Sequence, residues 1–216
     1  MKIMKNIYTL LAALLLAISC TQTFTFDESA NVPTPTPTPT PTPNDKELTS
    51  APYAVGDYYN DGVKEGVVFE VWDNGKSGKI VSMTKSSSTL KWSSDADEQK
   101  RLIGADSDTD GAYNMAVVKA ISGWESKYPA FKWCADLGED WYLPAKQELQ
   151  TIYNNRTAID ANLTDVIGTS WYWSSTEYDF QYSSGEFCAW HVFMNNGRTD
   201  NGLKSLVNYV RAVSAF

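Results

Sequence analysis

Hydrophobic and polar residues alternate most clearly in two short runs in the first half of the chain. Glu65–Asp73 (EGVVFEVWD) and Gly78–Thr84 (GKIVSMT) are rich in β-branched and aromatic residues, which favour strands. Asn74-Gly75 lies between the runs and is a strong signal for a tight turn. The pattern therefore predicts a β-hairpin.

The middle of the chain changes to a helical pattern. Residues 85–105 are rich in Ser and Asp and predict a loop, with Trp92 as its anchor onto the core. Apolar residues then recur at helical spacing. Asp110 suits the N-cap of the first helix, and Gly138 suits the end of the second. The predicted helices are 110–124, 131–137, 145–155 and 157–167.

Strand-like runs return in the last quarter of the chain. We expect strands at Trp171–Thr176, Phe187–Phe193 and Tyr209–Phe216, with a turn at Asn195-Asn196-Gly197. Strands, then helices, then strands is the order of an α+β domain with segregated layers. The last strand ends the chain, and we expect it to be paired in a sheet.

The N-terminus carries an export pattern. Lys2 and Lys5 precede the apolar run Ile7–Ile18, which is too short to span a membrane and is followed by Cys20. Small residues before a cysteine resemble a bacterial lipobox, which predicts a lipoprotein signal peptide at 1–19 and acylation of Cys20. An ordinary secretory signal that contains a cysteine is the alternative interpretation.

A linker is expected to separate the anchor from the domain. Residues 20–50 contain the run Val32–Pro43 (VPTPTPTPTPTP), in which proline at every second position prevents both helix and sheet. Residues 51–216 are long enough for one domain with a core. The organisation predicts a lipoprotein of the cell envelope, held at the outer membrane, with surface exposure as one option.

The net charge of the chain and its distribution limit the classes of partner that we expect. The chain has 18 Lys and Arg against 26 Asp and Glu, which gives a net charge of −8. The basic residues form no stripe, so nucleic acid is excluded as a partner. No apolar run reaches the ~20 residues of a spanning helix, which excludes a multispan membrane protein. The lipid anchor is the expected membrane contact.

Two segments in the middle of the chain carry a family signature, Trp133–Gly138 (WCADLG) and Trp141–Leu149 (WYLPAKQEL). They resemble the C-type-lectin-like fold in the version found in the C-terminal domain of the Lcl collagen-like adhesin family and in the Fibrobacter-type paralogous domains. Trp173–Tyr178 (WSSTEY) and Tyr209–Val213 (YVRAV) match the second half of that pattern. The opening Tyr53–Tyr59 resembles Bacteroidetes-type lipoproteins, so the resemblance covers residues 51–216.

The resemblance implies an α+β domain of mainly antiparallel sheets with two or more helices. The fold carries sugar binders, protein binders and a few enzymes. Because no acid/base or metal constellation is apparent in the sequence, we expect a binding module for a glycan or protein, with no cofactor and no enzymatic activity. The calcium motifs of sugar-binding members are missing, since Trp190-His191 stands where Trp-Asn-Asp would be. Two alternatives stay open: a structural or accessory subunit of a surface filament or envelope complex, and a binding protein diversified by a retroelement.

Two groups of residues are candidates for a disulfide and for a calcium site. Cys134 and Cys188 remain after acylation of Cys20, and in an exported chain they predict a disulfide, with two buried thiols as the alternative. Asp106, Asp108 and Asp110 match the first half of a calcium loop (DSDTDG), but Val117 stands where a bidentate Glu is needed. They form a weak calcium candidate, and a polar loop with a capping Asp110 is the preferred interpretation.

The aromatic segment 171–182 (WYWSSTEYDFQY) is the best candidate for a ligand face. Alternation buries about half of its rings, and aromatic rings beside carboxylates and amides suit a sugar or a protein surface. The sole His191 has no partner for catalysis or metal binding in the sequence pattern. The predicted ligand-binding residues are Tyr178, Asp179, Phe180, Gln181, Tyr182, Asn195, Asn196, Arg198 and Asp200.

Overall fold

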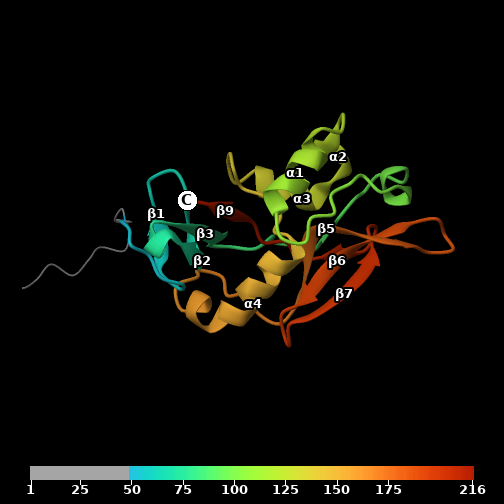
Figure 1. Ribbon diagram of the computed structural model, residues 1–216. Helices are drawn as coiled ribbons and strands as arrows, with labels where there is room; N and C mark the ends of the chain where they lie inside the picture. The colour runs from blue at the N-terminus through green and yellow to red at the C-terminus, as the bar shows by residue number, and fades with distance from the viewer. Residues whose placement is uncertain (1–48) are drawn as a thin grey trace, which may run out of the picture. The chain divides into compact units, whose positions relative to one another are not determined.

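The computed structural model of this protein describes residues 49–216, and Figure 1 shows their arrangement. The predicted signal peptide, Cys20 and all of the linker except its last two residues lie outside the described residues. Within the described part, four α-helices and mainly antiparallel strands confirm the α+β class. No helix in that part is long and apolar enough to cross a membrane.

The first sheet holds four antiparallel strands in the order β1-β2-β3-β9. β2 and β3 form the predicted hairpin, closed by the short 3-10 turn η1 (Asp73–Gly75). Gly75 has φ 80°, and a Cβ there would lie 2.3 Å from the Tyr53 carbonyl oxygen, so the turn requires glycine. The strands are β1 (Tyr58–Asn60), β2 (Glu65–Trp72), β3 (Ser77–Ser82) and β9 (Val213–Ala215).

The helices differ from the prediction mainly in where they end. The first helix stops at Lys119 rather than Trp124, because the chain turns through Gly123 at φ 70° before a separate short helix. Asp110 caps the first helix as predicted, and its Oδ1 accepts from the Tyr113 amide at 2.8 Å. The helices are α1 (Gly111–Lys119), α2 (Trp124–Lys127), α3 (Pro129–Ala135) and α4 (Lys146–Asp160).

A single helix, α4, covers the expected helix 145–155 and the first residues of the expected helix 157–167. The predicted separate fourth helix is therefore wrong. Asn155 does not end the helix, since its Nδ2 donates to the Phe69 carbonyl of β2 at 3.1 Å. The helix ends at Asp160, whose carboxylate accepts from the Ile167 amide at 2.9 Å. That bond folds residues 161–167 back as a non-helical turn.

The second sheet has the order β5-β6-β7, and its strands are all antiparallel. β6 matches the predicted range, whereas β5 continues to Gln181 and β7 was not predicted. A two-stranded sheet of β4 and β8 lies nearby in the fold. The bounds are β5 (Trp171–Gln181), β6 (Phe187–Phe193), β7 (Arg198–Leu203), β4 (Leu90–Lys91) and β8 (Val207–Asn208).

The C-terminal segment links the two larger sheets. Tyr209 bridges to Tyr172 of β5, and Val213 pairs with both β3 and Tyr142. The predicted strand 209–216 is therefore shorter, because its first half crosses between sheets before β9 begins. The expectation of a paired final strand is confirmed by the register of β9 against β3.

The core lies around α4, which contacts β2 on one side and β5 and β6 on the other (Figure 1). Trp92 is fully buried, with its ring 4.9 Å from Phe131 and 5.6 Å from Tyr128 in edge contacts. This contact confirms Trp92 as the anchor of the long loop, which also contains the 3-10 turn η2 (Glu98–Lys100).

A buried ion pair fixes the same loop to the second sheet. Glu177 of β5 and Lys204 are 1% and 0% exposed in their side chains and form a direct ion pair. The Glu177 carboxylate also accepts from the amides of Ile103, Gly104 and Ala105 at 2.8–3.1 Å. These bonds satisfy the buried charge and hold the loop against β5.

Candidate functional site

The sheet β5-β6-β7 carries two aromatic surfaces, on opposite faces and toward opposite ends. The faces differ because Trp190 and His191 are consecutive in β6 and consecutive strand residues point to opposite sides. The pocket surface is the aromatic cluster of Trp171, Trp173, His191 and Phe193, in which Trp173 is fully buried and Trp171 and Phe193 line the pocket. The hairpin surface consists of Tyr178, Phe180, Tyr182 and Trp190.

A pocket of about 360 Å³ opens beside the pocket surface. Trp171 and Phe193 stack in it, with 4.7 Å between ring centroids and 20° between ring planes. The Tyr209 amide donates to the Trp171 carbonyl at 3.1 Å, which joins two walls of the pocket through the backbone. The lining residues are Thr89, Thr169, Ser170, Trp171, Phe193, Val207, Asn208 and Tyr209.

His191 lies behind the pocket, between two tryptophans. Its ring centroid is 4.3 Å from that of Trp171 and 5.4 Å from that of Trp173. Asn208 Nδ2 lies 2.9 Å from His191 Nδ1, an arrangement in which the ring nitrogen accepts. Burial lowers the pKa of His191 from 6.5 to about 4, against an opposing effect of Asp200. The imidazole is therefore neutral near pH 7.

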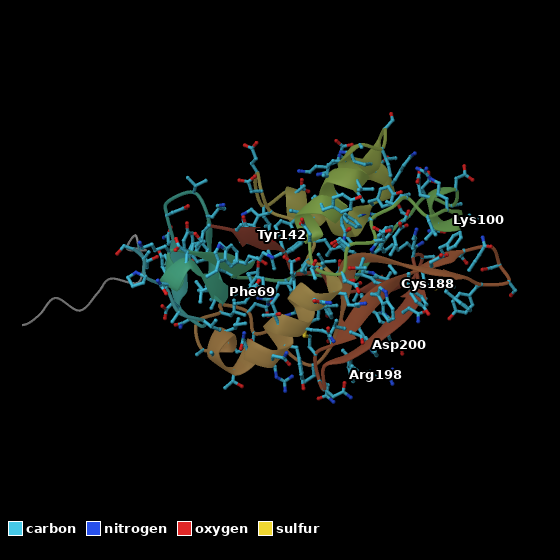
Figure 2. All side chains as sticks on the ribbon, in the orientation of Figure 1. Phe69, Lys100, Tyr142, Cys188, Arg198 and Asp200 are labelled. Atoms are coloured by element: carbon cyan, nitrogen blue, oxygen red, sulfur yellow. The ribbon has the colours of Figure 1, made fainter. Side chains whose placement is uncertain are left out.

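The rim of the pocket surface is charged but paired. The Arg198 guanidinium carbon lies 5.2 Å from the Trp171 ring centroid, a cation–π contact. Arg198 Nη2 also lies 3.0 Å from the Asp200 carboxylate. The turn that precedes β7 positions Arg198, since its amide donates to Asn196 Oδ1 at 3.0 Å. Figure 2 shows Arg198 and Asp200 at the start of β7.

The hairpin surface lies near the far end of β5. Tyr178 contacts Trp190 at 4.5 Å between centroids. Phe180 and Tyr182 are 47% and 43% exposed and meet edge to face at 5.0 Å. Lys146 of α4 places its Nζ 4.4 Å from the Trp190 ring centroid. The hairpin surface offers fewer hydrogen-bonding groups than the pocket lining, because the exposed side chains that define it are almost entirely aromatic.

The structure places the predicted ligand-binding residues in two separate groups. Trp171 is opposite Phe193 and Tyr178 is opposite Cys188. Phe193 and Cys188 are five residues apart on β6. Because a strand rises about 3.3 Å per residue, Tyr178 and Trp171 are separated by about 17 Å along the sheet. Figure 2 shows Cys188 and Arg198 toward opposite ends of this sheet. The predicted residues 178–182 therefore belong to the hairpin surface, whereas Asn195, Asn196, Arg198 and Asp200 lie at the pocket end.

A comparison with protein families decides the classification. The model of the Lcl C-terminal domain family matches residues 81–214, more than half of the chain. The chain belongs to the Lcl C-terminal domain family. A comparison with curated proteins gives no match.

Membership of the Lcl C-terminal domain family indicates an adhesin-like domain associated with a cell surface. All residues that line the pocket fall between Thr89 and Tyr209, inside the matched range. The hairpin surface also lies inside it. β1 and β2 precede the match, although they belong to the first sheet, in which β2 pairs with β3. The candidate site is thus part of the Lcl C-terminal domain itself.

Several pocket residues were missed by the sequence analysis. Thr89, Thr169, Ser170, Val207 and Asn208 come from three separate segments that the fold brings together. They are short polar or aliphatic residues without a motif. Only the aromatic density of 171–182 pointed to this sheet, and it did not mark the pocket at the Trp171 end of β5.

The predicted disulfide is also wrong within the described structure, where Cys134 and Cys188 are free thiols. Cys134 lies on α3 in the main hydrophobic core, whereas Cys188 lies on β6 outside that cluster. Burial raises the pKa of both thiols, that of Cys188 to about 11. Neither is a reactive thiolate near pH 7.

The weak calcium candidate has no converging carboxylates. Asp108 pairs with Lys146 at 2.7 Å, and Asp110 caps α1. Across residues 49–216, no three His, Cys, Asp or Glu side chains lie close enough to hold a metal ion. Two of the three carboxylates in this weak candidate, Asp106, Asp108 and Asp110, therefore have other partners, and Asp110 acts as the cap that was the preferred interpretation.

Two buried glutamates could be mistaken for catalytic acids. Glu148 accepts from the amides of Gly111 and Ala145, from the Tyr142 hydroxyl at 3.0 Å, and from Lys79 Nζ at 2.7 Å. Glu177 is occupied in the same way by three amides and a lysine. Their hydrogen bonds join loops and helix starts to the sheets, so both carboxylates have a structural role.

Proposed function

We propose that this protein is a cell-envelope lipoprotein, anchored at the outer membrane through acylated Cys20, whose Lcl C-terminal domain is a non-catalytic, adhesin-like binding module for a glycan. The family match supports the adhesin-like character. The apolar run before Cys20 supports export and anchoring. The predicted proline-rich linker then spaces the domain from the membrane.

The observation that carries this proposal is the pocket beside Trp171. Its volume of about 360 Å³ falls in the range of roughly 300–1,000 Å³ that is typical of small-molecule sites. Three aromatic side chains and several hydroxyl groups line it. Aromatic faces accept the apolar face of a sugar ring, and hydroxyl groups satisfy the polar edge of that ring.

The environment of the titratable groups supports binding without chemistry. A general acid or base works best with a pKa near the operating pH. His191 is neutral and faces Asn208, and Glu148 and Glu177 are fully engaged with backbone amides and lysines. A glycosidase needs two carboxylates free to face a substrate. These buried carboxylates are not free.

The test is glycan binding by the full-length chain, solubilised in mild detergent, on an array of neutral and acidic host and microbial glycans. We expect a saturable signal that survives EDTA and that Trp171→Ala reduces at least about ten-fold. Trp72→Ala is the matched control, since Trp72 is 44% exposed on β2 and lies outside the pocket. Thermal unfolding of each variant separates lost binding from lost folding.

The hairpin surface supports a second candidate, a protein ligand. Exposed aromatic residues are enriched at protein interfaces, and Phe180 and Tyr182 are exposed together. If Phe180→Ala/Tyr182→Ala abolished binding and Trp171→Ala did not, the ligand face would be the hairpin surface and the glycan proposal would be wrong.

The remaining alternatives have less support. A filament subunit that donates a free final strand is weakened by β9, which is paired to β3 along its length. Diversification of the binding face by a retroelement stays a prediction.

A further inference from the structure

We infer that a second pocket of this domain binds an α-amino-acyl unit, that is, a primary ammonium group attached to an apolar side chain and a carbonyl group. This α1 pocket lies between residues 139–142 and four residues of α1, Ala112, Met115, Ala116 and Lys119, and has a volume of about 230 Å³. It shares no lining residue with the pocket of the β5-β6-β7 sheet. The inference therefore does not depend on the glycan proposal.

One wall of the α1 pocket is a stripe of α1 that carries little bulk. Ala112 and Ala116 are four residues apart and so share one face of the helix. Both are exposed, and both line the pocket. Met115 lines it as well and is 3% exposed, so it adds buried apolar surface. Two methyl groups and a thioether give this wall an apolar character.

The other wall is aromatic and is held in place by hydrogen bonds. Trp141 and Tyr142 are 4% and 6% exposed. The Tyr142 backbone exchanges hydrogen bonds of 2.9 and 3.0 Å with Val213 of β9, and Figure 2 labels Tyr142 beside that strand. The Glu148 carboxylate accepts from the Tyr142 hydroxyl and from the Gly111 amide at the start of α1. One carboxylate thus ties both walls together, so a ligand meets a pocket that is already formed.

Two carboxylates at the α1 pocket have no partner. The side chains of Glu139 and Asp140 line the pocket, and neither makes a hydrogen bond or an ion pair within residues 49–216. Lys119 also lines the pocket without an ion pair in that range, so it does not neutralise them. A net negative charge beside an apolar wall favours a ligand that joins a cation to an apolar group.

A buried donor adds a third requirement. The indole N–H of Trp141 donates to no group in the described domain, whereas those of the buried Trp92 and Trp173 donate to backbone carbonyls at 3.0 and 2.9 Å. The Trp141 nitrogen is also not sealed from solvent, since Arg211 Nε is the only fully buried side-chain nitrogen or oxygen without a partner among residues 49–216. A carbonyl oxygen on the ligand would satisfy this N–H.

The volume suits one amino-acid side chain. An apolar cavity of about 150 Å³ holds a benzene ring, and sites for drug-sized ligands begin near 300 Å³. The α1 pocket, at about 230 Å³, lies between these values. A cation, an apolar body of this size and an acceptor occur together in an α-amino-acyl unit. Such a unit is present at the N-terminus of a peptide and in a free amino acid.

Isothermal titration calorimetry of the full-length chain in mild detergent tests this inference. Leucine amide is the probe, because it carries the ammonium group, a branched side chain and a carbonyl oxygen. N-acetyl-leucine amide lacks the charge, and glycine amide lacks the side chain. We expect each of these two to bind at least about ten-fold more weakly, because one loses the charge-assisted contact and the other loses the apolar burial.

Glu139→Gln/Asp140→Asn removes both carboxylates and should weaken the binding of leucine amide at least about ten-fold. Asparagine suits position 140, where φ is 67°, so the turn should be retained. Asp97→Asn/Glu125→Gln is the matched control, because these two exposed, unpaired carboxylates lie outside the pocket and their loss makes the same charge change. We expect this control to stay within about two-fold of the wild type.

Ala116→Leu fills the α1 pocket without changing a charge. Leucine is a strong helix former and position 116 is exposed, so we expect the variant to fold, as thermal unfolding would show. It should abolish the binding of leucine amide. Trp171→Ala should leave that binding unchanged, because Trp171 does not line the α1 pocket.

The tripeptide Leu-Gly-Gly and free leucine distinguish the two sources of the ligand. A tripeptide that binds as tightly as leucine amide assigns the pocket to peptide N-termini. Free leucine that binds more tightly than the amide, with an advantage that Lys119→Ala removes, assigns it to free amino acids.

Three results would overturn the inference. They are the absence of saturable binding by both leucine amide and free leucine, equal binding of N-acetyl-leucine amide, and binding that persists in Ala116→Leu or in Glu139→Gln/Asp140→Asn. A failure of glycan binding leaves the inference standing, since the two pockets have no residue in common.

Discussion

The most direct physical prediction concerns the titration of His191. Its ring lies between Trp171 and Trp173, and its Nδ1 accepts a hydrogen bond from Asn208. Burial therefore lowers its pKa from 6.5 to about 4. Since one pH unit corresponds to about 1.4 kcal/mol, the depression is equivalent to about 3 kcal/mol between the two charge states.

The sign of the effect on stability follows from proton binding. Between pH 6.5 and about 4, the unfolded chain binds a proton at His191 that the folded chain does not bind. The contribution of His191 to the free energy of unfolding should therefore be fully present above pH 6.5 and should be lost as the pH decreases toward 4. The loss attributable to this group should reach about 3 kcal/mol at and below that pH.

The assay is favourable because the chain has one histidine. In a chain covering Thr49–Phe216, the single imidazole Cε1–Hε1 NMR signal should titrate near pH 4. Urea unfolding at several pH values should show a slope that His191→Gln reduces by up to about 1.4 kcal/mol per pH unit. Glutamine retains an acceptor for Asn208, which makes the comparison a test of charge rather than of a lost hydrogen bond.

Two results would refute this reasoning. One is a measured pKa of 6 or higher, which would place the ring in contact with water or with a stronger negative field than Asp200 provides. The other is an acid slope that is the same in the wild type and in His191→Gln. Either result would show that the pocket wall is not packed as the ring contacts indicate.

Two further predictions concern the interior. Lys204→Met should lower the free energy of unfolding by about 3–5 kcal/mol, because it leaves the Glu177 carboxylate buried without its cation. Urea unfolding should show that the double variant Glu177→Gln/Lys204→Met recovers part of this loss. A loss below about 1 kcal/mol in Lys204→Met would contradict the buried pair. Cys134 and Cys188 should both be alkylated in unreduced protein after unfolding and neither before it, as mass spectrometry would show, whereas a disulfide would leave both unmodified in either state.

The strands were predictable where alternation was strong. β6 matches its predicted range, and the hairpin of β2 and β3 follows from Asn74-Gly75 between two apolar runs. β7 was missed because its sequence, RTDNGL, is mostly polar. It is an edge strand with half-buried side chains, so neither periodicity nor composition marks it.

The helix ends were less predictable, because tertiary contacts decide them. Asn155 and Thr157 favour a helix break by local propensity. The Asn155 side chain instead donates to the Phe69 carbonyl of β2, so the helix continues through both residues. No local pattern contains that information, since the partner lies 86 positions away in the sequence.

The candidate site was predictable only as an aromatic sheet. Alternation along 171–182 indicates which rings share a face, but the bulges in β5 after Trp173 and after Tyr178 alter that alternation. The register then places Trp171 beside Phe193 and Tyr178 beside Cys188. A local sequence pattern fixes neither the bulges nor the register, so it could not separate the pocket surface from the hairpin surface.

The way the pocket is built supports its assignment as a binding site. Its wall at Tyr209 is joined to its wall at Trp171 by backbone bonds on both sides, since Trp173 donates to the Tyr209 carbonyl at 3.0 Å. The neighbouring Asn208 is paired with Leu90 through β4 and β8. A ligand that enters such a pocket does not need to order the backbone first, so less of the interaction energy is lost to entropy. If the glycan proposal holds, the loss of affinity expected for Trp171→Ala therefore measures chiefly the contact of one ring with the proposed ligand.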